Sequence, residues 1–584
     1  MSLGFALDVT MRGLLNTTGR IQLVSQNITN ADKPGYTRKE GTSTFVTTNG
    51  GSVPVRLNVS GSGDRFLAKN LIDDISAVGR NKIISDFMDL YAKKLGTTDG
   101  STTMSGYLND MYGALQQLAT TPETMANKTE VMQIASNLAD SMRNLSGDIQ
   151  TQRLEAEKRI AETVNNINEA VSRIDMLNKQ ISYAQGNDAQ VAELDDERNY
   201  ELQKLSEDLG IQYFYNSQNQ VQIYTDGGQA LLLSSPQALS YTQTTVVNGS
   251  TVYPAGFSPI LLNGVDQTTT LQTGQLSGLI YLRDQALVNE QEKLDEFANT
   301  MAREINRAMN RGASLPPPPT LTGSEIGFTG ATAFSATGTF RVAVTNPQGI
   351  VQSAATINLV GMTTVNDLLT ALNAVPNVNA SLNASGELVI ASTLAGTGVS
   401  LNEMNSSVAP NSYGISHFFG MNNLFDNAGA ITGISNGAET IRIKDFYANN
   451  PDYIPVGALD VTAGVGGYGI TRGDGSISMA MSQVLKTNVS FNAAGNFGAQ
   501  SNTMLNYIQA LMADGANQAR LAQGEAETSS LTFQQTKDVF DGKAGVNIDE
   551  ETTKLIALEN NYQASAQMIS TIRDMFRELI DAVR

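Results

Sequence analysis

The sequence predicts a multidomain α+β protein with nested, discontinuous domains: terminal coiled-coil helices and a long-helix bundle, with β-rich domains inserted between them. Apolar residues recur every seven positions near both ends of the chain, which is the pattern of a coiled-coil seam. Long stretches between the ends keep helical periodicity, whereas strand-like alternation is confined to the middle. A chain of 584 residues is long enough to form several cores.

The N-terminal segment is predicted to be a helix that ends in a turn at 31–37, because Pro34 and Gly35 stop a helix and Tyr36 follows them. Residues 41–66 alternate Val with polar residues and are predicted to form an extended arm or a hairpin. The predicted seam of the helix consists of Leu7, Met11, Leu14, Ile21 and Ile28.

The middle of the chain is predicted to be a helical rod. Its longest helix, 122–185, would reach about 90 Å, and a kink is predicted at 145–149 because Ser and Gly support helices weakly. Residues 211–225 alternate around a polar turn, which predicts a hairpin at the start of a β region over 211–270. The predicted rod helices are 67–95, 122–185, 190–208, 275–311, 476–487 and 496–540.

The tetraproline at 316–319 predicts a stiff linker and a domain boundary. Beyond it, strand-like stretches flank one short helix, "VNDLLTALNAV", which indicates a small α+β insert. Residues 421–475 are loop- and strand-like. The predicted domains are therefore 1–40 with 541–584; 41–210 with 275–312 and 476–540; 211–274 with 421–475; and 313–420.

The C-terminal helix, from Ile548, has the most regular seam of the chain, with Asn547 as its predicted N-cap. Such a seam specifies a helical partner but not whose chain supplies it. The terminal seams could therefore close a bundle within one chain or pack between subunits. The predicted interface residues on this helix are Leu555, Leu558, Tyr562, Ile569, Ile572, Phe576 and Leu579.

Composition narrows the function. There is no Cys and one His, His417, which excludes disulfides, thiolate catalysis and Cys-ligated or multi-His metal sites. We therefore expect no enzyme activity, no catalytic residue, no cofactor and no metal. The net charge of −19 argues against a nucleic-acid partner. The sequence contains no run of about 18 apolar residues, so no membrane partner is expected.

Four short motifs could suggest other chemistry, and each has a simpler interpretation. "GVGGYG" at 464–469 lacks the helix that a dinucleotide site needs directly after it, so a loop is favoured. "RGD" at 472–474 is interpreted as a turn. The carboxylates of "LDDERN" (194–199) and "DEE" (549–551) are predicted to lie on a solvated helix face or at a helix N-terminus. His417 is expected to be structural.

Several stretches resemble a known family. "SQNITNADKPGYTR" and "GVNIDEETTKLIALENNYQASAQMISTIRDMF" are similar to the terminal signatures of bacterial flagellar axial proteins. "LDDERNYELQKLSEDLGI", "GQLSGLIYLRDQAL", "FFGMNNLF", "GAETIRI" and "GDGSISMAMSQV" resemble the first hook-associated protein family, at the hook–filament junction. The chain departs from that family at "KPGY" and "GDGS", and the segment after the tetraproline resembles a β-rich module of flagellins.

The resemblance implies a structural adaptor that joins the hook to the filament. It implies that the ends are disordered in the monomer, form the inner core of a helical tube on assembly, and are linked to the next layer by Pro34, Gly35 and Tyr36. Its implied partners are other copies in a helical ring, the hook protein, a second junction protein and an export chaperone on the C-terminal helix. The implied location is the extracellular flagellum, after type III export without a cleaved signal peptide. The alternatives are a hook or rod subunit, or a secreted enzyme or adhesin carried on flagellar export ends.

Overall fold

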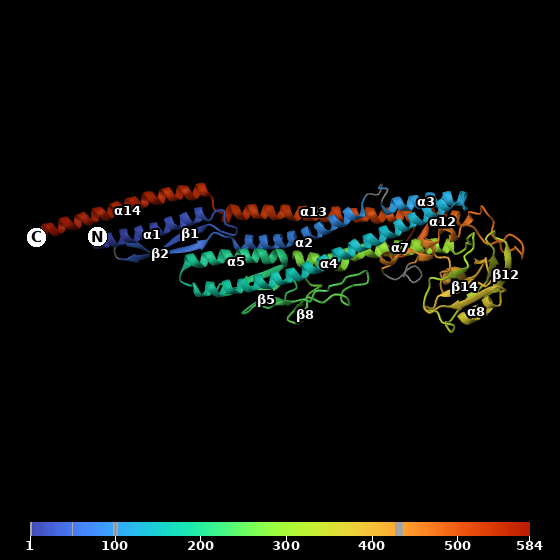
Figure 1. The fold of residues 1–584 in the computed structure, drawn as a ribbon. Helices are drawn as coiled ribbons and strands as arrows, with labels where there is room; N and C mark the ends of the chain where they lie inside the picture. The colour runs from blue at the N-terminus through green and yellow to red at the C-terminus, as the bar shows by residue number, and fades with distance from the viewer. Residues whose placement is uncertain (1–2, 49–50, 97–99, 101–102, 427–435, 584) are drawn as a thin grey trace.

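The molecule is elongated, with both chain ends at one extremity and a β-rich insert at the other (Figure 1). The computed structural model describes residues 3–48, 51–96, 100, 103–426 and 436–583. Of the predicted segments, residues 1, 2 and 584 of the terminal domain and 427–435 of the β region lie outside the described residues.

The end of the molecule that holds the termini is built from two helices and a hairpin. Helix α1 (Leu3–Thr29) lies along α14 (Ile548–Val583) and contacts it, and α14 extends beyond the start of α1 (Figure 1). Strands β1 (Lys39–Thr48) and β2 (Gly51–Gly61) pair as an antiparallel hairpin, which resolves the choice between an arm and a hairpin. The hairpin covers α1, since Arg20 donates to the Gly41 carbonyl at 3.0 Å.

The rod is a bundle of long helices that share one large core. Helix α4 runs without interruption through the predicted kink at 145–149, because Ser146 is buried and donates to Gln291 at 3.0 Å while Gly147 lies on the exposed face. The rod helices are α2 (Arg65–Leu95), α3 (Met104–Thr120), α4 (Met125–Tyr183), α5 (Asp188–Asp208), α6 (Gly274–Tyr281), α7 (Leu287–Met309), α12 (Ser476–Lys486) and α13 (Met504–Ala544).

Three features of the rod differ from the sequence prediction. Helix α3 was not predicted, and a π-helical segment, Leu282–Ala286, joins α6 to α7. Helix α13 begins at Met504 rather than at 496, because β19 (Val489–Phe491) and β20 (Gln500–Asn502) form a hairpin first. Gly495 in that hairpin has a φ of +55°, and a Cβ there would lie 2.4 Å from the Asn289 carbonyl oxygen.

The predicted hairpin at 211–225 is present and belongs to the first of two small three-stranded sheets beside α4, which have the strand orders β3-β4-β5 and β6-β7-β8 (Figure 1). Two amides on α4 bind these strands as a neighbouring strand would: Asn168 accepts from the Leu239 N–H and donates to its carbonyl, and Asn178 does the same with Val221. The strands are β3 (Ile211–Tyr215), β4 (Val221–Thr225), β5 (Ala230–Leu232), β6 (Leu239–Ser240), β7 (Leu261–Leu262) and β8 (Val265–Asp266).

The insert has its own apolar core, which draws on residues from Leu321 to Met421. Its sheets have the orders β12-β11-β15, β13-β14-β9 and β10-β16. The elements are β9 (Thr320–Thr322), β10 (Ala336–Thr337), β11 (Thr339–Thr345), β12 (Val351–Asn358), α8 (Val365–Asn373), β13 (Val378–Leu382), β14 (Leu388–Ser392), β15 (Gly398–Asn402), β16 (Ser407–Val408) and α9 (Ile415–Phe418).

The tetraproline is not a free linker. Pro317 and Pro318 are buried. The Pro318 carbonyl accepts from the Val399 N–H at 2.8 Å, and the Pro319 carbonyl accepts from the Ser392 N–H at 2.9 Å. Proline lacks an N–H but keeps its carbonyl acceptor. The segment is therefore held against the insert through its carbonyl groups.

The described part of 421–475 is largely non-β, and the described strands of 211–274 share no sheet with it. Its backbone is held by polar side chains of α7: Asn306 binds Leu424 and Phe425, and Asp295 accepts from the Asn436 and Ala438 N–H groups. This segment therefore follows the rod surface. Its elements are β17 (Phe425–Asp426), α10 (Gly437–Thr440), β18 (Arg442–Ile443), α11 (Asp445–Asn449) and a 3-10 turn at Pro451–Tyr453.

Candidate assembly site

The predicted seam of α14 faces α1 of the same chain at its centre. Ile572 is buried, with 9% of its surface exposed. The neighbouring seam residues Leu555, Leu558, Ile569 and Phe576 are partly buried. On α1 the predicted residues that are partly buried are Leu7, Leu14, Ile21 and Ile28, while the buried apolar positions are Leu23 and Val24.

Other predicted seam residues remain exposed in the single chain. Met11 is 55% exposed, Tyr562 is 40% exposed and Leu579 is 58% exposed. At 3.6 residues per turn, Met568, Met575 and Leu579 form a second stripe along α14, which we call the flanking stripe. Met568 and Met575 were not among the predicted residues, although their spacing of seven was the available signal. Exposed Leu15, Phe45, Val46 and Val55 add apolar surface on α1 and the hairpin.

The predicted turn between the layers is a close-packed corner. Gly35 has a φ of +77°, and a Cβ there would come within 2.9 Å of the Tyr200 Cβ on α5. Both facts favour glycine at this position. Tyr36 follows and donates its hydroxyl to Asn27 at 2.9 Å. Burial, together with the nearby Asp196 carboxylate, raises the pKa of Tyr36 to about 12, so the phenol stays protonated at neutral pH.

Asn27 connects three segments that are far apart in the sequence. Its Oδ1 accepts from the Lys39 N–H at 2.9 Å, and its Nδ2 donates to the Lys39 carbonyl at 3.0 Å. The same Nδ2 donates to the Glu551 carboxylate on α14 at 2.8 Å. Asn27 therefore uses its amide to hold the end of α1, the start of β1 and the start of α14 together.

Lys39 and Asp196 form a buried ion pair that joins this corner to the rod. Lys39 Nζ lies 2.5 Å from Asp196 Oδ2 and also donates to the Ala192 carbonyl at 2.7 Å. Thr37 donates its N–H and its hydroxyl to the same carboxylate. Burial lowers the pKa of Lys39 and raises the pKa of Asp196, because desolvation disfavours both charges. We call Asn27, Tyr36, Thr37, Lys39, Asp196 and Glu551 the junction cluster.

The cluster corrects one prediction about carboxylates. The carboxylates of "LDDERN" and "DEE" were predicted to lie on a solvated helix face or at a helix N-terminus, but Asp196 is buried in α5, and Glu551 is buried as well. Glu551 does lie in the first turn of α14, and Asn547 accepts from the Asp549 N–H as the predicted cap. Acidic residues are usually solvated, so only the fold reveals the partners that these two bind.

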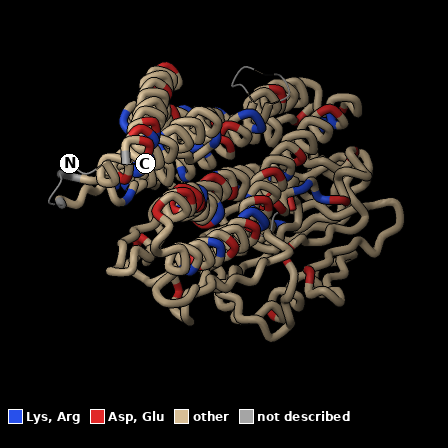
Figure 2. The backbone as a smooth tube through the Cα atoms, turned by 90° about the vertical axis from the view of Figure 1, so that its left-hand side faces the viewer, with Lys and Arg blue, Asp and Glu red and all other residues tan. Residues whose placement is uncertain are grey.

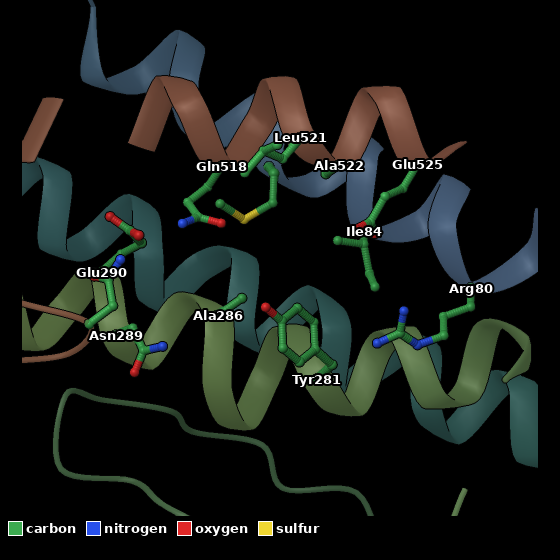
Figure 3. Close-up of a pocket in the computed structure, with 12 residues that line it drawn as sticks. Arg80, Ile84, Tyr281, Ala286, Asn289, Glu290, Gln518, Leu521, Ala522 and Glu525 are labelled. Atoms are coloured by element: carbon green, nitrogen blue, oxygen red, sulfur yellow. The ribbon is translucent and has the colours of Figure 1, made fainter. Parts of the chain in front are cut away.

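A hollow of about 430 Å³ lies between α2, α7 and α13 (Figure 3). Glu290 at its edge accepts from the Tyr91 hydroxyl at 2.7 Å and from Lys293 Nζ at 2.7 Å. Tyr281, directly before the π-helical segment, and Ala286, its last residue, both line the hollow. Because its buried acid is already paired, the hollow offers packing surface rather than acid–base chemistry.

The other motifs have structural roles. Gly466 and Gly467 of "GVGGYG" exchange backbone hydrogen bonds with Val351 of the insert. Asp474 of "RGD" accepts from the Ala458 and Ser476 N–H groups, so its carboxylate caps the local backbone. His417 is buried against Tyr413, with 4.5 Å between ring centroids, and burial lowers its pKa to about 4.

Glu325 and Asp426 are two carboxylates near enough for the charge of Asp426 to act on Glu325. Burial raises the pKa of Glu325 to about 7, and the Asp426 charge adds to that effect. Neither residue lines the pocket beside Pro316 and Asp474. Lys444 next to them donates to the carbonyls of Thr322, Gly420 and Met421, which is a structural role.

Charges are spread over the helices, with Lys and Arg interspersed among Asp and Glu (Figure 2). Over the described ranges, no helix is long and apolar enough to cross a membrane. Within the same residues, no group of three or more His, Asp or Glu side chains is placed to hold a metal ion.

Comparison with known proteins places these features in a class. Residues 95–321 match the family model of the flagellar hook-associated protein FlgK helical domain, and residues 542–582 match the C-terminal model of flagellar basal body rod FlgEFG proteins. The fold and both matches define a structural protein of the bacterial flagellum. Within that class, the helical segment 95–321 of this chain is similar to that of the FlgK hook-associated proteins.

Individual relatives are distant. The flagellar hook-associated protein 1 of Salmonella typhimurium and that of Salmonella typhi are each 25% identical over 328 residues. The match covers 52% of this chain and 56% of each relative, so it spans little more than half of their length. The flagellar hook junction protein FlgK from Burkholderia pseudomallei has a solved structure with a TM-score of 0.48 and 16% identity, covering 80% of this chain and 99% of that one.

Proposed function

We propose that this chain is the adaptor subunit that joins the flagellar hook to the filament, and that it assembles through α1 and α14 into a helical ring. One observation carries the proposal: α14 has two neighbouring apolar stripes, and only one of them is covered within the chain. The inner seam around Ile572 packs on α1, whereas the flanking stripe stays exposed. Exposed apolar stripes of this kind mark protein–protein contacts.

The interface would comprise the predicted residues of both helices together with the flanking stripe. The hairpin extends this surface, because Phe45 is 59% exposed beside α1. The junction cluster would fix how the terminal layer is oriented on the rod. We also propose that the rest of the chain is divided into the rod, the β region and the insert. The insert would then face away from the terminal end, as it does in Figure 1.

The proposed partners are further copies of the chain, the hook protein, a second junction protein and an export chaperone that binds the C-terminal helix. The proposed location is the outer part of the flagellum, reached by the flagellar type III export system. These partners are supported by the similarity to flagellar proteins at 95–321 and 542–582 and by the amphipathic character of both terminal helices.

The flanking stripe gives the sharpest test of assembly. The double variant Met568→Asp and Met575→Asp should leave the free subunit folded, because both side chains are already half exposed. It should prevent the subunit from assembling on isolated hooks in a sedimentation assay. The matched control is Gln563→Asp with Gln567→Asp, which adds the same two charges on the exposed polar face of α14. If the methionine variant assembled as well as the control, this stripe would not be a subunit contact.

A further inference from the structure

Burial along the terminal helices is uneven. At the junction end, Asn27 is 1% exposed and Glu551 is 2% exposed, and all their partners come from the same chain. Over the described residues, Thr10 is the only buried position of α1 before Leu23, and Ile572 is the only buried position of α14 after Glu551. The two helices are therefore well packed at the junction and thinly packed beyond it.

The junction cluster needs no second subunit to be satisfied. The Asp196 carboxylate accepts hydrogen bonds from the Thr37 N–H and hydroxyl and from the Lys39 ammonium. The Tyr36 hydroxyl and the Lys39 N–H donate to the Asn27 amide oxygen. The Asn27 amide nitrogen donates to Glu551. The Arg38 N–H adds a bond of 2.7 Å to the Ala544 carbonyl at the end of α13. Local stability follows buried, internally satisfied contacts, so this end should open less often than the distal turns.

We propose that the junction cluster is an intramolecular latch. In the free subunit it keeps residues 23–29 of α1 and 548–555 of α14 folded against each other and connected to α5 through Lys39 and Asp196. The distal turns of both helices become ordered when neighbouring copies cover them. Because Asn27 binds Tyr36 and Lys39 near the N-terminus and Glu551 near the C-terminus, the latch couples the two ends of the chain. The ordering of the distal turns by neighbouring copies rests on the proposed function. The latch itself does not, because all of its bonds lie within one chain.

The coupling has a physical basis. Removing Glu551 leaves the buried Asn27 amide without one acceptor, and a buried polar group without a partner disfavours the folded arrangement around it. Asn27 also holds Lys39, which in turn pairs with Asp196. A change near the C-terminus should therefore loosen the turn near the N-terminus, although more than 500 positions separate them, since Asn27 and Glu551 lie 524 apart.

Hydrogen–deuterium exchange on the free, full-length subunit tests the latch. Backbone amides of 23–29, 36–40 and 548–555 should exchange at least about tenfold more slowly than those of 5–18 and 560–580. In Glu551→Ala, protection of 36–40 should fall at least about tenfold as well, whereas Glu559→Gln, on the exposed face of α14, should change nothing. Asp196→Asn provides a second variant that should loosen the same turn from the rod side.

Two results would overturn the latch: uniformly fast exchange through both terminal segments of the free subunit, or unchanged protection of 36–40 in Glu551→Ala. Circular dichroism of each variant shows whether the rod is still folded. The latch and the adaptor function fail separately. If the junction segments are protected but the chain does not bind hooks, the latch is supported and the adaptor function is refuted. If the chain binds hooks but the junction segments are not protected, the adaptor function is supported and the latch is refuted.

Discussion

Aspartate in place of both Ile569 and Ile572 would put two carboxylates against α1 at the centre of the α14 seam. Ile572 is buried and Ile569 is partly buried in that contact. Losing the burial of each isoleucine costs about 2 kcal/mol. Removing each new carboxylate from water adds about 1–3 kcal/mol if it is held there without a partner.

The helices can avoid the second cost by separating, so we take the lost burial, about 4 kcal/mol for the pair, as the effect on the contact. That corresponds to roughly a thousandfold weaker association of α14 with its helical partner. The large core of the rod contains no residue of α1 or α14 among its described members. The melting temperature of the rod should therefore change little.

The assay compares this variant with Gln563→Asp plus Gln567→Asp, which carries the same added charge on the polar face. Secretion, melting temperature and incorporation at the hook are measured separately, because an export chaperone could bind the same apolar face. We expect normal secretion and melting, but no incorporation and no motility. A motile strain that carries both isoleucine substitutions would refute the reasoning that this seam holds the junction together.

Two further predictions concern the insert. Because His417 is the only histidine, its proton NMR signal can be followed directly, and it should titrate with a pKa of about 4 rather than 6.5. The unfolded chain then binds a proton that the folded chain does not, so His417 lowers stability as the pH falls from 6.5 to 4, by about 3 kcal/mol at most; His417→Gln should remove this contribution in pH-dependent melts, and a pKa near 6.5 would contradict the buried environment. The second change replaces residues 321–421 with a short Gly/Ser linker and adds Lys444→Met, because Lys444 would otherwise lose its bonds to Thr322 and Gly420. This variant should keep the calorimetric transition temperature of the rod. A strongly lowered transition temperature would show that the insert and the rod share a core.

Local periodicity was enough to predict most helices and the hairpins. Helices α1 and α14, the hairpin at 211–225 and the helix at 190–208 all depend on residues close in sequence, and each is present. Helix α3 was predictable too, since Met104, Leu108, Met111, Leu115 and Leu118 keep helical spacing and are buried in the structure.

What could not be predicted depends on contacts between distant residues. Lys39 and Asp196 are 157 positions apart, and nothing in "LDDERN" distinguishes a buried acid from its solvated neighbours. The hairpin before α13 brings Gly495 close to the backbone of Asn289, and the local sequence does not encode this contact. For the same reason, sequence spacing identified the seam of α14 but not which of its apolar stripes the chain itself would cover.

The central claim is that the terminal helices attach this chain to the end of the hook. Electron cryomicroscopy of isolated hooks incubated with the full chain, or with a chain lacking residues 548–584, tests it most directly. We predict a ring of subunits at the hook tip, with α1 and α14 on the inside, for the full chain and bare hooks for the truncated one. Equal binding by the truncated chain, or density for the full chain along the sides of the hook rather than at its tip, would contradict the account.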